Sequence, residues 1–344
     1  MGASQSNETI NLKKHKYLSG PVSLYYLEKD DQKIFLFGDE HYSLRQTCKS
    51  DLDSIDFIKF LNTIFSTTEE KIDFLIESRY NYIENKDIKS IKNIYIDEMS
   101  YLTKVIKFYV KKGCLISNKK NCSKSYPNVN FHSVDYRFSN LCKPVEKIQN
   151  LIQELFIIMF YLTTNNIKRI SDLFKNIMES LKSYNTYNKM ESLIESIFNC
   201  KKMKKQIEKC DNNIKSKILH YKNDVFKHNK KLNEESYNNI TKELKEIFEN
   251  RDEIFSFSML SMHIAQLLNI IVSINAVVMD IYCLSRLFGS SMKNVVAYTG
   301  DAHTRNYVDF LTNYMGFDLK YGGKAVNRRC LNISKVPKIL FSKK

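Results

Sequence analysis

Two short segments of the chain, residues 38–41 and 300–303, share the pattern G-D-x-H. The chain has only 9 glycines and 7 histidines in 344 residues. In a chain of this composition with its residues in random order, the expected number of G-D-x-H segments is about 0.01. Histidine nitrogens and carboxylate oxygens bind divalent metal ions and carry protons during hydrolysis. The repeated pattern therefore indicates a functional site that is divided between two distant segments.

Each copy of the pattern follows an apolar run with the composition of a buried strand, KIFLF for the first and NVVAYT for the second. Two more such runs, IDFLI and NFHSV, lead into Glu77 and into Asp135 and Arg137. The carboxyl ends of parallel strands lie along one edge of a sheet, and such folds bind ligands at that edge. We therefore expect these side chains to meet both histidines in one cleft.

The first hypothesis for this cleft is a divalent metal centre, with Mn, Co or Zn as the ion. His41 and His303 would be ligands, and Glu77 would be a ligand or the general base. Arg137 would stabilise the developing oxyanion. The carboxylates that would act as further ligands, orient the imidazoles or assist catalysis are Asp39, Glu40, Asp301, Asp135 and Asp280. A metal-free alternative stays open, in which one histidine is the general base and a carboxylate holds it.

The pattern of strands and helices predicts an α/β fold with a mostly parallel sheet flanked by helices. Its core would be split between residues 21–144 and 253–330. Residues 145–252 contain neither proline nor glycine and repeat apolar residues at helical spacing, so they predict a large all-helical insertion. Residues 1–20 and 331–344 would be a flexible amino-terminal tail and a basic carboxyl-terminal tail.

The stretch from residue 254 to 279 has His263 as its only ionisable side chain. It is long enough to cross a bilayer as a helix, but polar residues are scattered through it, which favours a buried core helix. Both alternatives stay open at this point. Asp280 follows directly, and its carboxylate could point into the cleft or pair with a lysine.

The first six residues, MGASQS, fit the N-myristoylation pattern, with Gly2 as the acceptor. An ordinary amino terminus that matches by chance is the alternative. One acyl chain binds a bilayer only marginally, and the lysines near both termini would add attraction for anionic lipid. We therefore expect an anionic membrane surface as a partner, together with an unknown protein or small-molecule substrate.

The formal charge of +15 comes mainly from lysine, in a chain rich in asparagine and without tryptophan. No nucleic-acid recognition motif accompanies this charge, so we do not expect nucleic acid as a partner. Eight widely spaced cysteines without a C-x-x-C pair or a secretory signal predict a reduced, intracellular protein. The expected location is the cytoplasmic face of a membrane or a virion.

The motifs together resemble the superfamily of TIKI, TraB and erythromycin-esterase-like proteins, which includes ChaN-like haem-binding proteins. SLYYLEKDDQKIFLFGDEH resembles its first element, IDFLIES its second, VDYR its arginine element, and VVAYTGDAHTRNYVDFLTNYMGFD its last. The resemblance covers about residues 21–142 and 253–320. It implies roles for His41, Glu77 and His303, and for Arg137.

The resemblance implies a metal-dependent hydrolase of ester, peptide or amide bonds that acts at a membrane surface. Members of the superfamily differ in activity, so the fold does not determine the reaction. The alternative is a non-enzymatic, myristoylated protein of a membrane or virion, with a degenerate or ligand-binding cleft. The lysine- and asparagine-rich composition, with the acylation pattern, also resembles proteins of large DNA viruses of eukaryotes.

Overall fold

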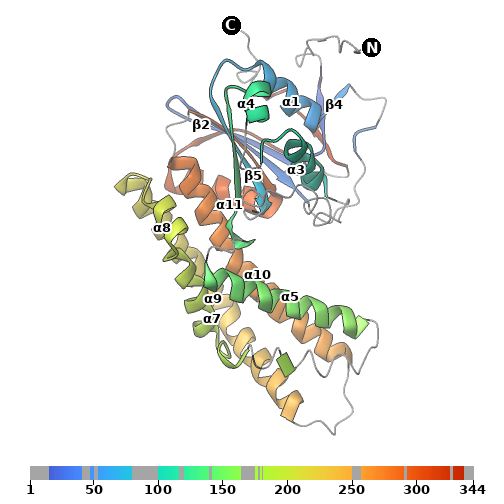
Figure 1. The fold of residues 1–344 in the computed structure, drawn as a ribbon, viewed down its shortest axis with the longest axis vertical. Helices are drawn as coiled ribbons and strands as arrows, with labels where there is room; N and C mark the ends of the chain where they lie inside the picture. The colour runs from blue at the N-terminus through green and yellow to red at the C-terminus, as the bar shows by residue number, and fades with distance from the viewer. Residues whose placement is uncertain are drawn as a thin grey trace. The chain divides into compact units, whose positions relative to one another are not determined.

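The computed structural model of the 344-residue chain describes residues 15–40, 47–49, 53–79, 100–115, 120–138, 142–163, 175–176, 179, 181–249, 257–289, 293–325 and 328–336. The chain forms two compact units (Figure 1). The α/β unit comprises residues 1–134 and 290–344, and the helical unit comprises residues 135–289.

A six-stranded sheet forms the centre of the α/β unit, in the order β6-β5-β7-β3-β2-β8. β7 pairs in parallel with both β5 and β3, whereas β2 is antiparallel to β3 and β8. The strands are β2 (Ser23–Lys29), β3 (Gln32–Asp39), β5 (Ile72–Arg79), β6 (Val129–Asp135), β7 (Asn294–Gly300) and β8 (Asp318–Lys324). The four strands of the expected cleft, β3, β5, β6 and β7, are thus confirmed, as is the mixed α/β class with a sheet flanked by helices.

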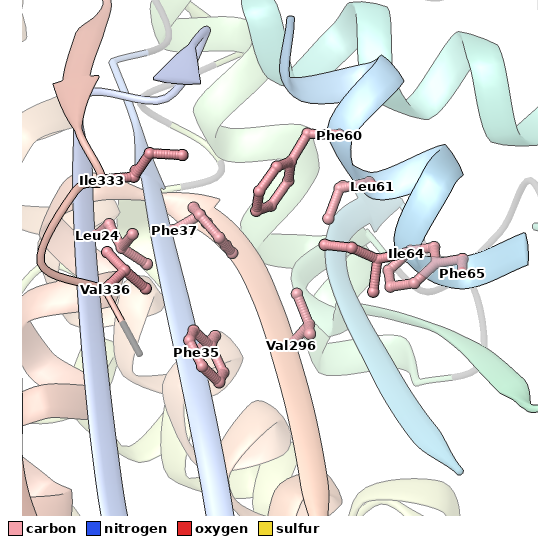
Figure 2. A pocket seen from close by; sticks show the side chains of 10 residues that line it. All are labelled: Leu24, Phe35, Phe37, Phe60, Leu61, Ile64, Phe65, Val296, Ile333 and Val336. Carbon is pink, nitrogen blue, oxygen red and sulfur yellow. The ribbon is translucent and has the colours of Figure 1, made fainter. Parts of the chain in front are cut away.

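One face of the sheet packs against α1 (Phe57–Thr67), α3 (Tyr101–Lys111) and α4 (Lys120–Ser125). α1 begins at Asp56, whose carboxylate accepts hydrogen bonds from the amides of Ile58 and Lys59 and so satisfies two unpaired donors of the first turn. Phe60 and Phe65 of α1 lie with Phe35 and Phe37 of β3 and Val296 of β7 around a small pocket (Figure 2). All ten side chains that surround this pocket are apolar, so it offers no group for acid–base chemistry.

The opposite side of the sheet carries α11 (Asp301–Asp309), which contacts β2, β3 and β7 and continues into the π-helical turn η4 (Phe310–Tyr314). A separate sheet has the order β4-β1-β9 and consists of β4 (Ser54–Asp56), β1 (Tyr17–Ser19) and β9 (Cys330–Asn332). β9 brings the carboxyl-terminal part of the chain beside its amino-terminal part.

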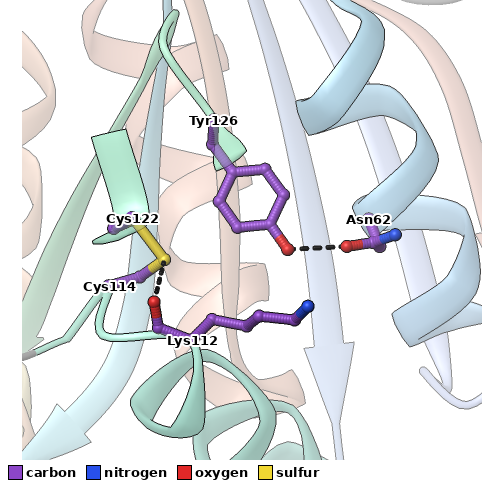
Figure 3. Close-up of a disulfide and its surroundings, with 5 residues drawn as sticks. All are labelled: Asn62, Lys112, Cys114, Cys122 and Tyr126. Atoms are coloured by element: carbon purple, nitrogen blue, oxygen red, sulfur yellow. Dashed lines mark hydrogen bonds between the residues drawn. A yellow bond between two sulfur atoms is a disulfide. The ribbon is translucent and has the colours of Figure 1, made fainter. Parts of the chain in front are cut away.

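Three disulfides correct the prediction of a fully reduced protein. They are Cys48–Cys330, Cys114–Cys122 and Cys142–Cys200, whereas Cys210 and Cys283 are free and buried. The Cys114–Cys122 disulfide joins the end of α3 to α4, and next to it the Tyr126 hydroxyl donates to Asn62 of α1 at 2.6 Å (Figure 3). Two of the pairs join residues that are 282 and 58 positions apart, which no local pattern indicates, whereas Cys114 and Cys122 are only 8 positions apart.

The helical unit begins with the short helix η3 (Tyr136–Phe138). It continues with α5 (Lys143–Thr163), α7 (Tyr187–Phe198), α8 (Lys201–Ile207), α9 (Asn212–Glu249) and α10 (Phe257–Phe288). The described residues of the predicted insertion, 145–252, are therefore mainly helical. We assigned residues 253–289 to the core from the sequence, but α10 packs on α5, α7, α8 and α9 and belongs to the helical unit.

Residues Met259–Phe288 of α10 are long and apolar enough to cross a membrane. In the structure, however, 78% of the most apolar window of this helix is buried within the protein. This burial is consistent with the core-helix alternative, because a helix that is apolar on all sides also packs at the centre of a helical bundle.

Candidate functional site

Glu77 and His303 lie together at the carboxyl edge of the sheet in the α/β unit. Glu77 is near the end of β5, and His303 is in the first turn of α11, directly after β7. His303 Nε2 is 3.9 Å from Glu77 Oε1, and the two side chains are only 10% and 6% exposed. The structure thus brings together two of the three residues expected to form the metal site.

The position of Glu77 is fixed by the main chain of the neighbouring strand. The amide of Gly300 donates a hydrogen bond of 2.6 Å to Glu77 Oε2. This bond holds one carboxylate oxygen against the end of β7 and leaves Oε1 as the atom that faces His303. A buried carboxylate that accepts an amide hydrogen bond is held in one orientation.

The position of His303 is fixed by its helical neighbour Thr304. The Thr304 hydroxyl lies 3.0 Å from that of Thr299 and donates to the carbonyl oxygen of Phe37 at 3.2 Å. These buried contacts anchor the first turn of α11 to both β7 and β3. The first turn of α11, which carries the His303 imidazole, is therefore held in position by contacts with β3 and β7.

Gly38 allows this close approach of α11 to the sheet. A Cβ atom at residue 38 would lie 2.2 Å from Ser23 Oγ and 3.0 Å from the Cα of Asp301. Gly38 and Gly300 are the glycines of the two G-D-x-H segments. Both residues are the last or next-to-last residues of strands, and neither is among the glycines with positive φ. Gly38 provides space, not an unusual backbone conformation.

Asp301 has cationic and hydroxyl partners beside this pair. Ser23 Oγ donates to Asp301 Oδ1 at 2.5 Å, and Lys324 Nζ lies 3.2 Å and Arg305 Nε 3.4 Å from Oδ2. Asp301 is itself buried. Its carboxylate therefore joins β2, β8 and the first turn of α11, which stabilises the helix start next to His303.

Asp39 faces the other side of the sheet and binds Arg329. Its Oδ1 accepts from Arg329 and from the Tyr298 hydroxyl, and its Oδ2 accepts from Ser100 Oγ at 2.8 Å and from the amide of Leu102 at 3.3 Å. Burial and the neighbouring Asp39 raise the pKa of Tyr298 well above its usual value, so its hydroxyl stays a donor.

Arg329 was missed by the sequence analysis. Besides binding Asp39, it donates to the carbonyl oxygens of Gly20 and Glu40. No local pattern marks this residue, because its partners are about 290 to 309 positions away in the chain. It fixes the end of β3 and the backbone of Glu40, the last described residue before residues 41–46.

The other predicted site residues belong to the helical unit or lie outside the described residues. Arg137 forms three hydrogen bonds with Asp135: Nε donates to Oδ1 at 2.8 Å, Nη2 donates to Oδ2 at 3.1 Å, and the backbone amide donates to Oδ1 at 3.2 Å. Asp280 is a buried residue of α10. His41 and Gly2 lie outside the described residues, so their roles remain predictions.

The Glu77 and His303 atoms fit a shared divalent ion after a small approach. A tetrahedral ion with bonds of about 2.1 Å places two ligand atoms about 3.4 Å apart. The observed separation is 3.9 Å, so an approach of about 0.5 Å would be required. Within the described residues, no group of three or more histidine, cysteine or acidic side chains has an arrangement suited to a metal ion. This part of the chain therefore provides two ligands, and a third remains a prediction.

Residues 161–327 match the model of a family of unknown function (DUF5847). The matched stretch contains most of the helical unit, β7 and the second G-D-x-H segment, but not Glu77. No curated protein matches the chain. No solved structure matches it either.

Proposed function

We propose that the chain is a hydrolase of the TIKI and TraB type that cleaves an ester or amide bond with Glu77 and His303. The observation that carries the proposal is the buried Glu77–His303 pair at the carboxyl edge of parallel strands. This edge is the usual place for a functional site in an α/β sheet. Both residues also match the motifs that carry the family resemblance.

A divalent ion is part of this proposal, held by His303 Nε2 and Glu77 Oε1. When bound, such an ion supplies a polarised carbonyl group and a water molecule with a lowered pKa. The chain itself orients the two ligands. The Gly300 amide donates to Glu77, and the Thr304 hydroxyl, next to His303, donates to the carbonyl oxygen of Phe37. His41 is proposed as the further ligand from the sequence alone.

The same pair also supports proton transfer without a metal. His303 would accept the proton of an attacking water at Nδ1, because Nε2 faces Glu77. The Glu77 carboxylate would then stabilise the imidazolium, as a carboxylate does in other histidine-based hydrolases. Burial of both side chains strengthens this interaction, since little water competes for it.

We further propose that acylation at Gly2 attaches the protein to a membrane. The support for this part is the amino-terminal pattern MGASQS. It can fail without affecting the hydrolase proposal, because unacylated protein retains both Glu77 and His303.

The test uses full-length, unacylated protein with its disulfides intact. Hydrolysis of p-nitrophenyl esters and of a mixed fluorogenic peptide library is measured with and without added Mn²⁺, Co²⁺ or Zn²⁺. We expect Glu77→Gln and His303→Ala each to lower the rate by about 100-fold or more. Ion binding, measured by calorimetry, should weaken in both variants if the ion is bound as proposed.

His132→Ala is the matched control, because His132 is also a histidine beside a buried carboxylate of the same sheet. Its Nε2 lies 3.1 Å from Asp73 Oδ1. We expect this variant to retain the rate and the ion affinity of the wild type. A wild-type protein that neither binds an ion nor hydrolyses any substrate would favour the non-enzymatic alternative. Equal losses in His132→Ala and His303→Ala would refute the assignment of the site.

A further inference from the structure

Lysine is concentrated on one short element of the helical unit, helix α8. The chain has 44 lysines in 344 residues, so nine residues of average composition would contain about one. The five lysines of residues 201–209 are Lys201, Lys202, Lys204, Lys205 and Lys209. The lysine content of these nine residues is thus more than four times the average of the chain.

The cluster determines the net charge of the helical unit. Residues 135–289 contain 23 basic and 18 acidic side chains. Residues 201–217 contain 7 of these basic and 2 of these acidic side chains, which leaves 16 of each in the rest of the unit. The whole excess of five positive charges in this unit therefore lies in one stretch of seventeen residues.

The lysines of α8 project away from the protein. Met203, Gln206 and Ile207 are its buried residues, and helical periodicity places Lys201, Lys204 and Lys205 on the opposite face. These three lysines are exposed, as is Lys209 just beyond the helix. The only acidic side chains in the stretch are those of Glu208 and Asp211. The exposed face of α8 therefore carries an excess of positive charge.

α8 is held rigidly at both ends. The disulfide between Cys142 and Cys200 fixes the residue that precedes the helix. At the other end, Gln206 Nε2 and Cys210 Sγ both donate to the carbonyl oxygen of Ser285 in α10, at 3.1 Å and 3.4 Å. A partner that binds the lysines therefore does not have to order the backbone that carries them, which lowers the entropic cost of binding.

A hollow of about 450 Å³ lies on the helix that follows. It is bordered by residues of the first part of α9, namely Asn212, Lys215, Ser216, Leu219, His220 and Asn223. Apart from Leu219, these side chains offer ammonium, amide, hydroxyl and imidazole groups, which can donate hydrogen bonds to an anion. Lys215 belongs to both the hollow and the basic stretch. The hollow therefore suits a phosphate-bearing head group beside a surface that attracts anions.

We propose that α8 and the start of α9 form a docking surface for acidic phospholipids. Clusters of four to eight basic residues on an amphipathic helix are typical of binding to such lipids. Residues 201–217 contain no arginine and no aromatic residue, and these are the residues that commonly bind and stack on nucleic acids. The surface is independent of Glu77 and His303, so it does not depend on the hydrolase proposal.

The experiment measures binding of full-length, unacylated, oxidised protein to sedimented vesicles. One set of vesicles is pure phosphatidylcholine, and the other contains about 30% phosphatidylserine. The variant replaces four exposed lysines by glutamine, at Lys201, Lys204, Lys205 and Lys209. Each lysine near an anionic bilayer strengthens binding about fivefold, so the variant should bind phosphatidylserine vesicles at least 100-fold more weakly.

The matched control removes four other exposed lysines, Lys59, Lys111, Lys227 and Lys242, and so has the same net charge as the variant. We expect less than about a threefold change for this control. Equal losses in the two variants, or equal binding to neutral and acidic vesicles, would overturn the proposal. Tighter binding to single-stranded or duplex RNA than to acidic vesicles, lost in the α8 variant, would instead assign the surface to nucleic acid.

Discussion

Replacing Arg329 by methionine tests how strongly the end of β3 depends on its buried ion pair. The side chains of Arg329 and Asp39 are only 3% and 0% exposed. Methionine retains much of the apolar volume of arginine but leaves the Asp39 carboxylate without its cation. Removal of one partner from a buried pair typically destabilises a protein by about 3–5 kcal/mol.

The contacts around the pair place the expected effect within that range. Asp39 would retain its bonds from Tyr298, Ser100 and the Leu102 amide, which limits the cost of an uncompensated charge. The carbonyl oxygens of Gly20 and Glu40 would lose a donor, at about 1 kcal/mol each. We therefore expect the free energy of local opening at β3 to fall by about 3–4 kcal/mol.

Hydrogen exchange followed by mass spectrometry suits this measurement, because it reports the opening of β3 separately from that of the helical unit. The protein is kept oxidised, so that the Cys48–Cys330 disulfide stays closed beside Arg329. Arg329→Lys is the control, and it should lose less because it keeps the charge. The double variant Arg329→Met, Asp39→Asn should lose less than the sum of the two single variants. A loss below about 1 kcal/mol for Arg329→Met would refute the reasoning.

Three further predictions concern the glycine of the first pattern and the cysteines. Gly38→Ala should destabilise the α/β unit by about 1–3 kcal/mol in urea unfolding, because its Cβ would meet Ser23 and Asp301; unchanged stability would contradict the close packing. Alkylation with mass analysis should count two free thiols in the denatured, unreduced protein and eight after reduction, whereas eight before reduction would exclude the disulfides. Burial raises the pKa of the Cys210 thiol to about 11, so at pH 8 it should react with iodoacetamide about 100-fold more slowly in the folded than in the unfolded protein. The contribution of this neutral thiol to stability is present below pH 9 and is lost as the pH rises to about 11. Equally fast labelling of the folded and unfolded protein at pH 8 would contradict the raised pKa of Cys210.

The strands and helices near the site could be predicted because their signals are local. Apolar runs marked β3, β5, β6 and β7. Each of these patterns extends over fewer than fifteen residues and reflects burial of one face of an element. The prediction that Glu77 and His303 meet followed from the rule for parallel strands, and their atoms lie 3.9 Å apart.

The contacts that stabilise the site could not be predicted, because they join residues that are distant in sequence. Ser23 and Asp301 are 278 positions apart, and Asp39 and Arg329 are 290 positions apart. The sequence around a single lysine, arginine or serine does not indicate which distant residue that side chain will bind. The Cys48–Cys330 disulfide, with a separation of 282 residues, was missed for the same reason.

The two G-D-x-H segments are alike in sequence but not equivalent in the sheet. β3 pairs with β7 so that Asp39 lies opposite Gly300 and Gly38 lies opposite Thr299. The two patterns are thus displaced by one residue. β3 continues through Asp39, whose side chain reaches the face covered by α3 and binds Ser100 and Arg329.

β7 instead ends at Gly300, and Asp301 already belongs to α11. Because neighbouring residues of a strand point to opposite faces, a displacement of one residue separates the surroundings of the two aspartates. Asp39 therefore stabilises the junction with the carboxyl-terminal segment, whereas Asp301 stabilises the helix that carries His303. The repeated motif predicts related roles for its two copies. In the described residues, the second copy makes the contact with Glu77, through His303.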